Sequence, residues 1–232
     1  MTTALIVGAG PGLSTSLARA LRARGHDLVL AARDPADLEP LASEIEATLV
    51  ACDAGRPEDV DRLFAVVDAR PGPLAVAVYN PSARTRGPVT ELDREAVWEA
   101  LRVTAYGAFL MAQAATARML PGAAEGRTGN LLFTGASAGV KGYAGSAPFA
   151  MGKFALRGLC QSLARELHPK GIHVGHVVVD GAIASAARPP DAARPDAMLD
   201  PQALADTFLV LLDQPRSAWS WEVEVRPWVE TF

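Results

Sequence analysis

The sequence predicts an α/β fold, a doubly wound parallel sheet of about seven strands with helices on both faces. Short runs that are apolar at nearly every position alternate with longer segments of helical periodicity. Strands without a polar face are typical of parallel sheets, because helices cover both sides of such a sheet. No linker rich in glycine, serine and proline interrupts the alternation, so we expect one domain over residues 1–232.

The expected elements follow one another in strand–helix order. The expected strands are 4–7, 27–32, 48–52, 74–79, 130–134, 173–179 and 221–225. The expected helices are 13–23, 57–69, 94–119, 148–167 and 201–212. Residues 182–198 are too polar and too often broken by proline for either element, and we expect a flexible lid over a site there.

Composition excludes several classes of protein. The net charge is −4, and no basic stripe or lysine-rich tail is present, which argues against a nucleic-acid partner. Cys52 and Cys160 are far apart and lack metal-ligand spacing, so we expect neither a disulfide framework nor a metal site. No signal peptide and no run near the roughly 18 apolar residues of a membrane span is present. We therefore expect a soluble cytoplasmic protein without a membrane partner.

A glycine-rich turn follows the first expected strand. Its residues are Gly8, Ala9, Gly10, Pro11, Gly12, Leu13 and Ser14. Glycines allow a tight turn here and let backbone N–H groups approach a pyrophosphate at the helix N-terminus. The position after the first strand of a βαβ pattern favours a dinucleotide site over an ordinary tight turn.

The end of the second expected strand bears on the choice of cofactor. A carboxylate at this point would bind a ribose 2′-hydroxyl and repel a 2′-phosphate. Ala32 leaves that space empty and Arg33 follows it, which favours NADP(H) over NAD(H). The alternative is that Arg33 is a solvated loop arginine and that Asp34 binds the hydroxyl.

Over nearly its whole length the chain resembles the short-chain dehydrogenase/reductase family. Gly8 and Gly12 match the first two glycines of that family's turn, and Ser14 replaces the third. The resemblance implies a Rossmann-like domain that binds a nicotinamide dinucleotide. Asp53 matches the family's adenine-contacting aspartate, with a turn at a helix start as the alternative. Asn80 is the one residue kept from the family's Asn-Asn-Ala-Gly.

Further family positions surround the expected nicotinamide site. Gly181 and Ile183 follow the sixth expected strand, where the backbone of the family meets the nicotinamide. The cofactor contacts implied together are Gly8, Gly10, Pro11, Gly12, Leu13, Arg33, Asp53, Asn80, Lys153, Gly181 and Ile183.

The catalytic positions depart from the family pattern of Ser, Tyr, Lys and Asn. Lys153 matches the lysine, which in the family binds the nicotinamide ribose and lowers the pKa of the tyrosine from about 10. Phe149 stands where the tyrosine belongs, Ala136 where the serine belongs and Thr104 where the asparagine belongs. Positioned proton transfer contributes about 10²–10⁴ in rate. A carbonyl reductase without these groups would be severely impaired.

Two residues are candidates to replace the missing proton donors. Ser137 lies one place beyond the family's serine, with a capping role as the alternative. Tyr143 lies in a loop that borders the substrate in the family, with loop anchoring as the alternative. Lys153, Ser137 and Tyr143 are therefore the catalytic candidates. Structural roles are favoured for the other polar residues that attract notice: Tyr79, Tyr106, His173, His176 and Asp180.

Two surface features bear on substrate and partners. Arginines near the mouth of the expected site could attract an anionic substrate, although scattered surface arginines are the favoured interpretation. They are Arg84, Arg86, Arg188 and Arg194. The expected helices 94–119 and 148–167 are rich in Ala, Leu and Met, and the resemblance implies that they form a homodimer or homotetramer interface. Burial within one subunit is the alternative.

Three functions remain open. The favoured one is an NADP(H)-dependent oxidoreductase with a non-standard active site, acting on a small-molecule carbonyl, imine or iminium, or conjugated substrate. The second is a non-redox enzyme of the same fold, an isomerase, cyclase or dehydratase. The third is a nucleotide-binding pseudoenzyme.

Overall fold

The computed structural model describes residues 1–230 and contains one sheet of seven parallel strands in the order β3-β2-β1-β4-β5-β6-β7. The strands are β1 (Thr2–Val7), β2 (His26–Ala32), β3 (Thr48–Ala51), β4 (Leu74–Tyr79), β5 (Gly129–Thr134), β6 (Ile172–Val179) and β7 (Glu222–Val225). The helices are α1 (Leu13–Ala23), α2 (Glu39–Ile45), α3 (Pro57–Asp68), α4 (Arg94–Leu101), α5 (Gly107–Ala124), α6 (Ala147–Leu167) and α7 (Pro201–Asp213). The expected fold class is confirmed.

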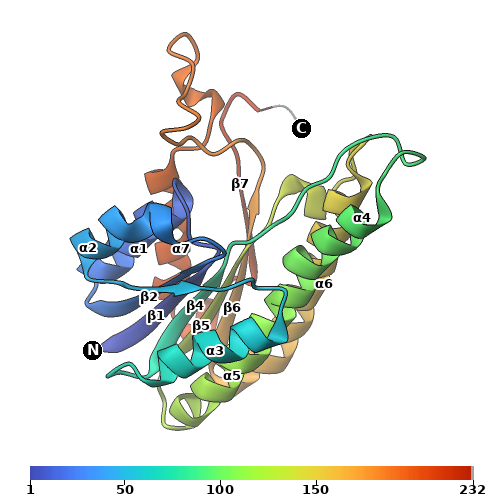
Figure 1. Ribbon diagram of the computed structural model, residues 1–232. Coiled ribbons are helices and arrows are strands. Elements are labelled where there is room, and N and C mark those ends of the chain that lie inside the picture. The colour runs from blue at the N-terminus through green and yellow to red at the C-terminus, as the bar shows by residue number, and fades with distance from the viewer. Residues whose placement is uncertain (231–232) are drawn as a thin grey trace.

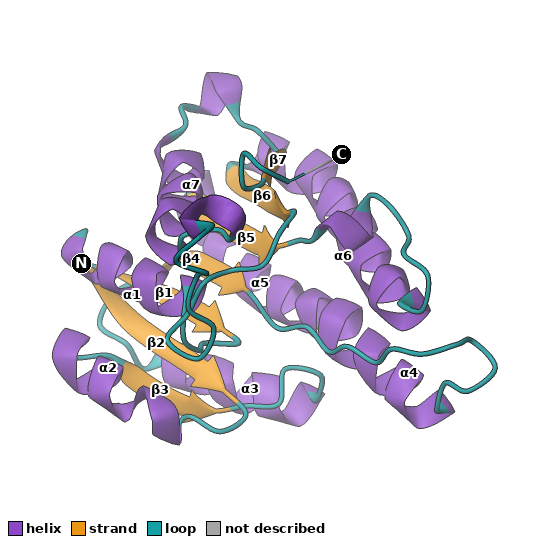
Figure 2. Cartoon of the chain, turned by 90° about the horizontal axis from the view of Figure 1, so that it is seen from above, coloured by secondary structure: helices purple, strands orange, loops and turns teal. Residues whose placement is uncertain are grey.

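Helices cover both faces of the sheet, as the all-apolar strands predict (Figures 1 and 2). Every residue of β5 and β6 is buried. One hydrophobic core lies between the sheet and α1, α2 and α7, and the other lies between the sheet and α3, α5 and α6. None of the helices within residues 1–230 has the length and apolarity needed to cross a bilayer.

The strand order reverses direction between β1 and β4, and this reversal positions the site. The chain runs outward from β1 to β2 and β3, then crosses back so that β4 pairs with the other edge of β1. The loops after β1 and β4 therefore leave the sheet in opposite directions. Ligands of open α/β sheets bind in the crevice that such a divergence opens at the carboxyl ends of the strands.

One of the expected helices needs correction. Residues 94–119 do not form one helix, because a π-helical turn, Arg102–Tyr106, separates α4 from α5. Helix α5 also continues beyond 119 to Ala124, with Pro121 inside its last turns. A π turn leaves the apolar periodicity of the flanking segments intact, so the sequence pattern does not reveal it.

Helix α2 is absent from the sequence-based expectation. It has seven residues, too few to show two turns of periodicity, and its Glu39-Pro40 start is typical of a loop. Proline is compatible with the first turn of a helix, where its missing N–H has no partner to lose. The remaining elements lie within two residues of their expected bounds.

The segment 182–198 forms no helix or strand beyond one short 3₁₀ turn, Pro195–Ala197, as expected. An isolated bridge between Ile183 and Leu199 closes its base. Ser185 and Arg188 form a tight turn through two backbone hydrogen bonds of 3.0 Å. The loop rises beyond the carboxyl ends of the strands, near the C-terminus in Figure 1. Its role as a lid stays a prediction.

Candidate active site and cofactor cleft

Two adjoining cavities lie at the carboxyl ends of the strands. The first, of about 910 Å³, runs from the glycine turn to the ends of β2 and β3. The second, of about 1140 Å³, lies beside β5, β6 and the start of α6. They share Asn80, Ser82 and Arg84 on the chain that leaves β4. One continuous cleft therefore connects a cofactor-sized groove with a substrate-sized pocket.

The glycine turn has a backbone that only glycine adopts readily. Gly8 and Gly12 have φ angles of 75° and 89°. A Cβ at Gly8 would lie 2.6 Å from Pro81, whereas a Cβ at Gly10 would meet nothing within 4 Å. Helix α1 begins at Leu13 with no side-chain cap and no acidic residue in its first turn. Its free N–H groups and positive dipole end are thus available to an anion.

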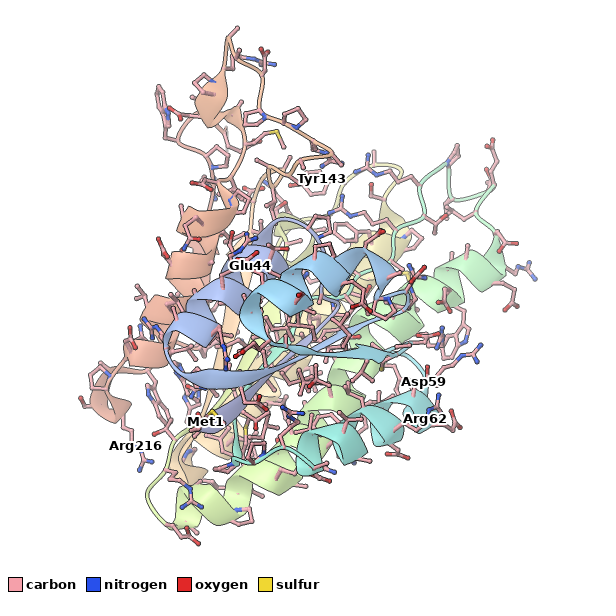
Figure 3. The ribbon with its side chains drawn as sticks, turned by 60° about the vertical axis from the view of Figure 1, so that its left-hand side comes forward. Met1, Glu44, Asp59, Arg62, Tyr143 and Arg216 are labelled. Atoms are coloured by element: carbon pink, nitrogen blue, oxygen red, sulfur yellow. The ribbon has the colours of Figure 1, made fainter. Side chains whose placement is uncertain are left out.

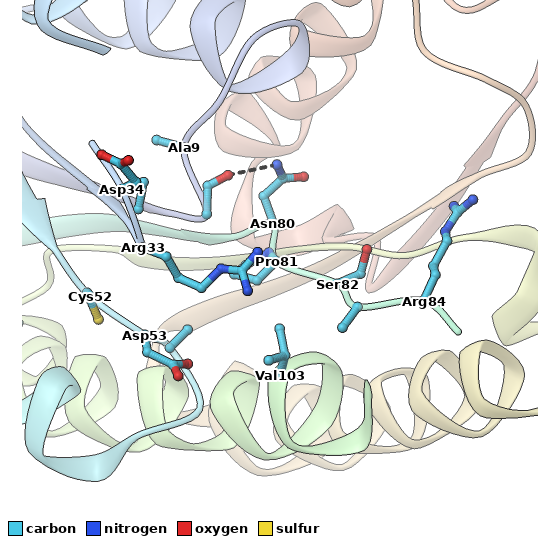
Figure 4. A pocket seen from close by; sticks show the side chains of 14 residues that line it. Ala9, Arg33, Asp34, Cys52, Asp53, Asn80, Pro81, Ser82, Arg84 and Val103 are labelled. Carbon is cyan, nitrogen blue, oxygen red and sulfur yellow. Dashed lines mark hydrogen bonds between the residues drawn. The ribbon is translucent and has the colours of Figure 1, made fainter. Parts of the chain in front are cut away.

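Ser14 and Asn80 explain why a serine replaces the family's third glycine. The amide of Asn80 donates to Ser14 Oγ at 3.0 Å and to the Gly8 carbonyl at 3.1 Å, the second bond being drawn in Figure 4. Ser14 Oγ itself donates to the Gly8 carbonyl at 3.4 Å. These bonds join the end of β4 to the glycine turn across the point where the strand order reverses.

At the other end of the first cavity, Arg33 and Asp34 adopt different roles. Both residues are exposed and line the cavity, and Figure 4 shows the Arg33 side chain extending toward Pro81 and the Asp34 carboxylate on the side away from Arg33. Asp34 Oδ1 accepts the N–H of Ala36 at 3.1 Å and so caps the turn after β2. Arg33 therefore presents the charge at the adenosine end of the groove.

Asp53 lines the same cavity, but its carboxylate already has partners. It accepts hydrogen bonds from Arg102 at 2.8 Å and from the N–H of Gly55 at 3.0 Å. Burial alone would raise the pKa of Asp53, but these hydrogen bonds outweigh it and hold the pKa below its ordinary value. The turn role given as the alternative is therefore present at Asp53, and the contact to adenine stays a prediction.

The second cavity contains the catalytic positions, and Lys153 is the family residue retained there. Its side chain is buried, and Nζ donates to the Thr134 carbonyl at 2.7 Å. Burial, and secondarily the charge of Arg84, lowers the pKa of Lys153 to about 7. An amine in this range exchanges protons near neutral pH.

Apolar groups occupy the positions of the missing tyrosine and serine. Phe149 and Ala136 are 7% exposed and form a small apolar cluster with Ala138. The guanidinium of Arg84 lies over the Phe149 ring, 4.0 Å from its centroid. Thr104, at the asparagine position, is buried in the π turn and accepts the N–H of Ala83 at 3.2 Å. No hydroxyl replaces the tyrosine at position 149 itself.

The two candidate donors line this cavity. Ser137 begins a 3₁₀ turn, and its hydroxyl makes no hydrogen bond with residues 1–230. Tyr143 is 44% exposed, with Lys141 Nζ 5.7 Å from its ring centroid. In Figure 3, Tyr143 lies below the 182–198 loop, at the opposite end of the molecule from Met1 and Arg216. The structure therefore brings Lys153, Ser137, Tyr143 and Phe149 to one pocket.

The nicotinamide end carries Gly181 and Ile183. Gly181 has a φ of 153°, and a Cβ there would lie 2.8 Å from Pro227. Ile183 lines the pocket below the base of the 182–198 segment. The glycine turn, the uncapped helix and this wall form a cradle of the right kind for a nicotinamide dinucleotide.

The structural roles favoured for other polar residues agree with their surroundings. Tyr79 is fully buried, and its hydroxyl donates to the Val103 carbonyl. His173 stacks on Trp219 with 4.8 Å between ring centroids. His176 Nδ1 contacts Glu222 at 3.0 Å. Asp180 forms ion pairs with Lys141 and Arg226 at 3.6 and 3.5 Å, so it is no free acid.

Three of the four arginines expected near the mouth of the site converge on the second cavity, although the sequence favoured scattered surface residues. Arg84, Arg86 and Arg188 all line it. Arg194 is different, because it pairs with Asp191 at 3.7 Å.

Fold and cleft define an α/β protein of the dinucleotide-binding type, and comparison with known proteins identifies the family. A family model described as short chain dehydrogenase matches residues 2–193. An uncharacterized oxidoreductase of Staphylococcus aureus strain N315 is 28% identical over 230 residues, 97% of this chain and 96% of the relative. The chain belongs to the short-chain dehydrogenase family, whose members are NAD(P)-binding oxidoreductases.

Solved structures of short-chain dehydrogenases resemble this chain over nearly its whole length. A short-chain dehydrogenase from Rhodopseudomonas palustris superposes with a TM-score of 0.84 at 31% identity, covering 98% of this chain and 99% of that one. A metagenomic short-chain oxidoreductase in complex with NADP has a TM-score of 0.83 at 26% identity, with 97% of each chain covered.

Proposed function

We propose that this protein is an NADP(H)-dependent oxidoreductase that acts on a small molecule without the family's tyrosine. One observation carries the proposal. The cleft has the glycine turn and the lysine that the family uses for its cofactor, but Phe149 stands in place of the tyrosine that donates the proton. The nicotinamide would supply a hydride to the substrate when bound.

The residues at the adenosine end support NADP(H) over NAD(H). Arg33 extends into the cavity, and the one carboxylate beside it on that loop, Asp34, is committed to a backbone N–H. A guanidinium favours a 2′-phosphate through charge-assisted hydrogen bonds. The glycine turn and the uncapped start of α1 would hold the pyrophosphate.

The lack of a strong proton donor around Phe149 limits the kinds of substrate that can be reduced efficiently. Addition of a hydride to a ketone generates an oxyanion that needs a proton, whereas addition to an iminium carbon gives a neutral amine directly. A conjugated acceptor tolerates a weak acid in the same way. Lys153, with its pKa lowered to about 7, and the hydroxyls of Ser137 and Tyr143 are the groups available to exchange a proton. Iminium and conjugated acceptors therefore depend less on the missing donor than simple ketones do, and the positive charge of the pocket favours the uncharged conjugated acceptor of the two.

Homodimer formation through α4, α5 and α6 is part of the proposal. Trp98 on α4 is 60% exposed, and Phe109 at the start of α5 is 42% exposed. Met151 and Phe154 on α6 are 50% and 45% exposed. Exposed apolar side chains gathered on neighbouring helices mark an interaction surface.

The cofactor assignment is tested by calorimetric titration of NADPH and NADH into the natural protein and an Arg33→Asp variant. We expect the natural protein to bind NADPH more tightly. The variant should lose about 1.5–3 kcal/mol of NADPH binding, the usual scale for a hydrogen bond to a charged group, with NADH binding nearly unchanged. Equal affinities in the natural protein would contradict the NADP(H) assignment.

A further inference from the structure

The substrate-side cavity is basic in an otherwise acidic protein. Lys153, Arg84, Arg86 and Arg188 line it, and none of its lining residues is an aspartate or a glutamate. The whole chain carries a net charge of −4. Positive charge is therefore concentrated in the cavity that contains the catalytic positions, and such a cleft attracts anions.

These three arginines differ from most others in the molecule because they lack a carboxylate partner. Arg157 pairs with Glu222 at 2.7 Å and Arg102 with Asp53 at 2.8 Å. Among residues 1–230 no ion pair involves Arg84, Arg86 or Arg188. Their charges are therefore available to a ligand.

Neighbouring structure positions the Arg84 side chain and the two loops that carry Arg86 and Arg188. Arg84 stacks on Phe149, 4.0 Å from the ring centroid. The loop that carries Arg84 and Arg86 is tied to the loop after β5 by the N–H of Gly87, which donates to the Gly145 carbonyl at 3.0 Å. Arg188 lies in the tight turn with Ser185. The cluster thus spans two walls of the cavity.

The three charges disfavour one another. Loss of surrounding water, followed by the charges of Arg86 and Arg188, lowers the pKa of Arg84. Like charges held close together without a counter-ion are unfavourable, and a bound anion relieves that repulsion. Guanidinium groups suit carboxylates and phosphates because their planar N–H groups form paired hydrogen bonds.

We propose that the substrate of this cleft carries a permanent negative charge, a carboxylate or phosphate group, bound by Arg84, Arg86 and Arg188. This inference rests on the proposed function and adds the substrate class. Arg84 lies against Phe149, so the anionic group binds close to the reacting centre. The positive charge of Arg84 then also lies beside the position of the absent tyrosine hydroxyl.

The test compares matched probes that differ in charge. The carboxylate pair is 3-benzoylpropionate and its methyl ester, and the phosphate pair is phenyl phosphate and phenol. Saturation-transfer NMR titrations measure their dissociation constants with the free protein and with the protein saturated with NADPH. We expect the anion of at least one pair to bind about tenfold or more tightly than its neutral partner, which corresponds to about 1.4 kcal/mol. Added salt should reduce that preference.

Variants assign the preference to the cluster. Arg84→Gln and the Arg86→Gln/Arg188→Gln double variant should each lose most of it. Arg165→Gln removes an exposed arginine of α6 that bonds only to a backbone carbonyl, and should keep it. Neutral and charged probes that bind alike, or no detectable binding of either anion, overturn the proposal.

The same titrations distinguish substrate binding by the arginines from binding of the cofactor phosphates, and from a failure of the proposed function. If the arginine variants weaken NADPH and leave the probes unaffected, the cluster serves the cofactor phosphates and the proposal is overturned. If NADPH itself does not bind, the proposed function fails, while the titrations of the free protein still decide whether the pocket selects anions.

Discussion

At position 149, one side chain removes a catalytic group while the surrounding cleft keeps its structure. Phe149 packs with Ala136 and Ala138, so the ring has lost its hydroxyl without losing its place in the fold. Lys153 remains buried beneath the pocket and bonds to the Thr134 carbonyl. The cleft is therefore prepared for an acid that it lacks, and its chemistry must depend on other groups.

Lys153 gives a pH-dependent prediction for stability. Its pKa in the folded protein is lowered from 10.5 to about 7, so the unfolded chain holds the proton to higher pH than the folded one. Between these two values the unfolded state binds more protons, and the free energy of unfolding rises with pH by as much as about 1.4 kcal/mol per unit. Lys153→Met should remove this contribution.

Urea denaturation between pH 7.5 and 9.5 measures the effect. The natural protein should gain stability relative to the Lys153→Met variant as pH increases. Lys170→Met, at an exposed lysine paired with Glu166, is the control and should follow the natural protein. Parallel stability curves for the natural protein and the Lys153 variant would contradict the lowered pKa.

At the scale of elements, two glycines of the turn after β1 should have different roles, one in the stability of the fold and one in cofactor binding. Gly8 has a left-handed backbone conformation, and a Cβ there would collide with Pro81. A Cβ at Gly10 meets nothing within 4 Å. Gly8→Ala should therefore destabilise the fold by about 1–3 kcal/mol, the cost of strained backbone. Gly10→Ala should leave the melting temperature nearly unchanged but weaken NADPH binding, because its methyl group would occupy open space at the turn where the pyrophosphate is proposed to lie.

Calorimetry with NADPH and thermal denaturation check both variants. Gly158→Ala, on α6 with open space at its Cβ position, controls for a change from glycine to alanine outside the cleft. Full NADPH affinity in Gly10→Ala would mean that the pyrophosphate does not lie against this turn.

The elements also show what the sequence can predict. The apolar strands and the longer helices repeat their patterns over enough residues to be recognised. The turn after β1 is recognisable from its closely spaced glycines. Helix α2 is too short for periodicity, and the π turn at Arg102–Tyr106 leaves the pattern of its neighbours unchanged.

The site was predictable only in part. Its cofactor residues follow strand ends and keep a family spacing. The cluster of Arg84, Arg86 and Arg188 arises from two loops brought together by the fold, and no local pattern indicates it. The same holds for the stacking of Arg84 on Phe149, which depends on how the loop after β4 folds back over α6.

At the scale of the whole molecule, the exposed apolar side chains of α4, α5 and α6 predict a homodimer. Trp98→Glu combined with Phe109→Glu places two charges on this surface and should convert the dimer to a monomer in light scattering. Val210→Glu, at an exposed valine of α7, is the matched control and should leave the dimer intact. A natural protein that is monomeric at micromolar concentration would contradict the assignment of this surface.

The central claim is that an intact NADP(H) cleft lacks its proton donor, and NADPH oxidation with small ketones tests it most directly. The natural protein should turn over ketones very slowly and a conjugated enone faster. Phe149→Tyr should raise ketone turnover by roughly 10-fold or more, within the range of positioned proton transfer, because Lys153 and Arg84 lower the pKa of the new phenol. Adding Ala136→Ser should raise it further, since both groups serve one oxyanion. Rapid ketone reduction by the natural protein would contradict the claim. So would a failure of the natural and doubly substituted proteins to reduce any acceptor while NADPH is bound.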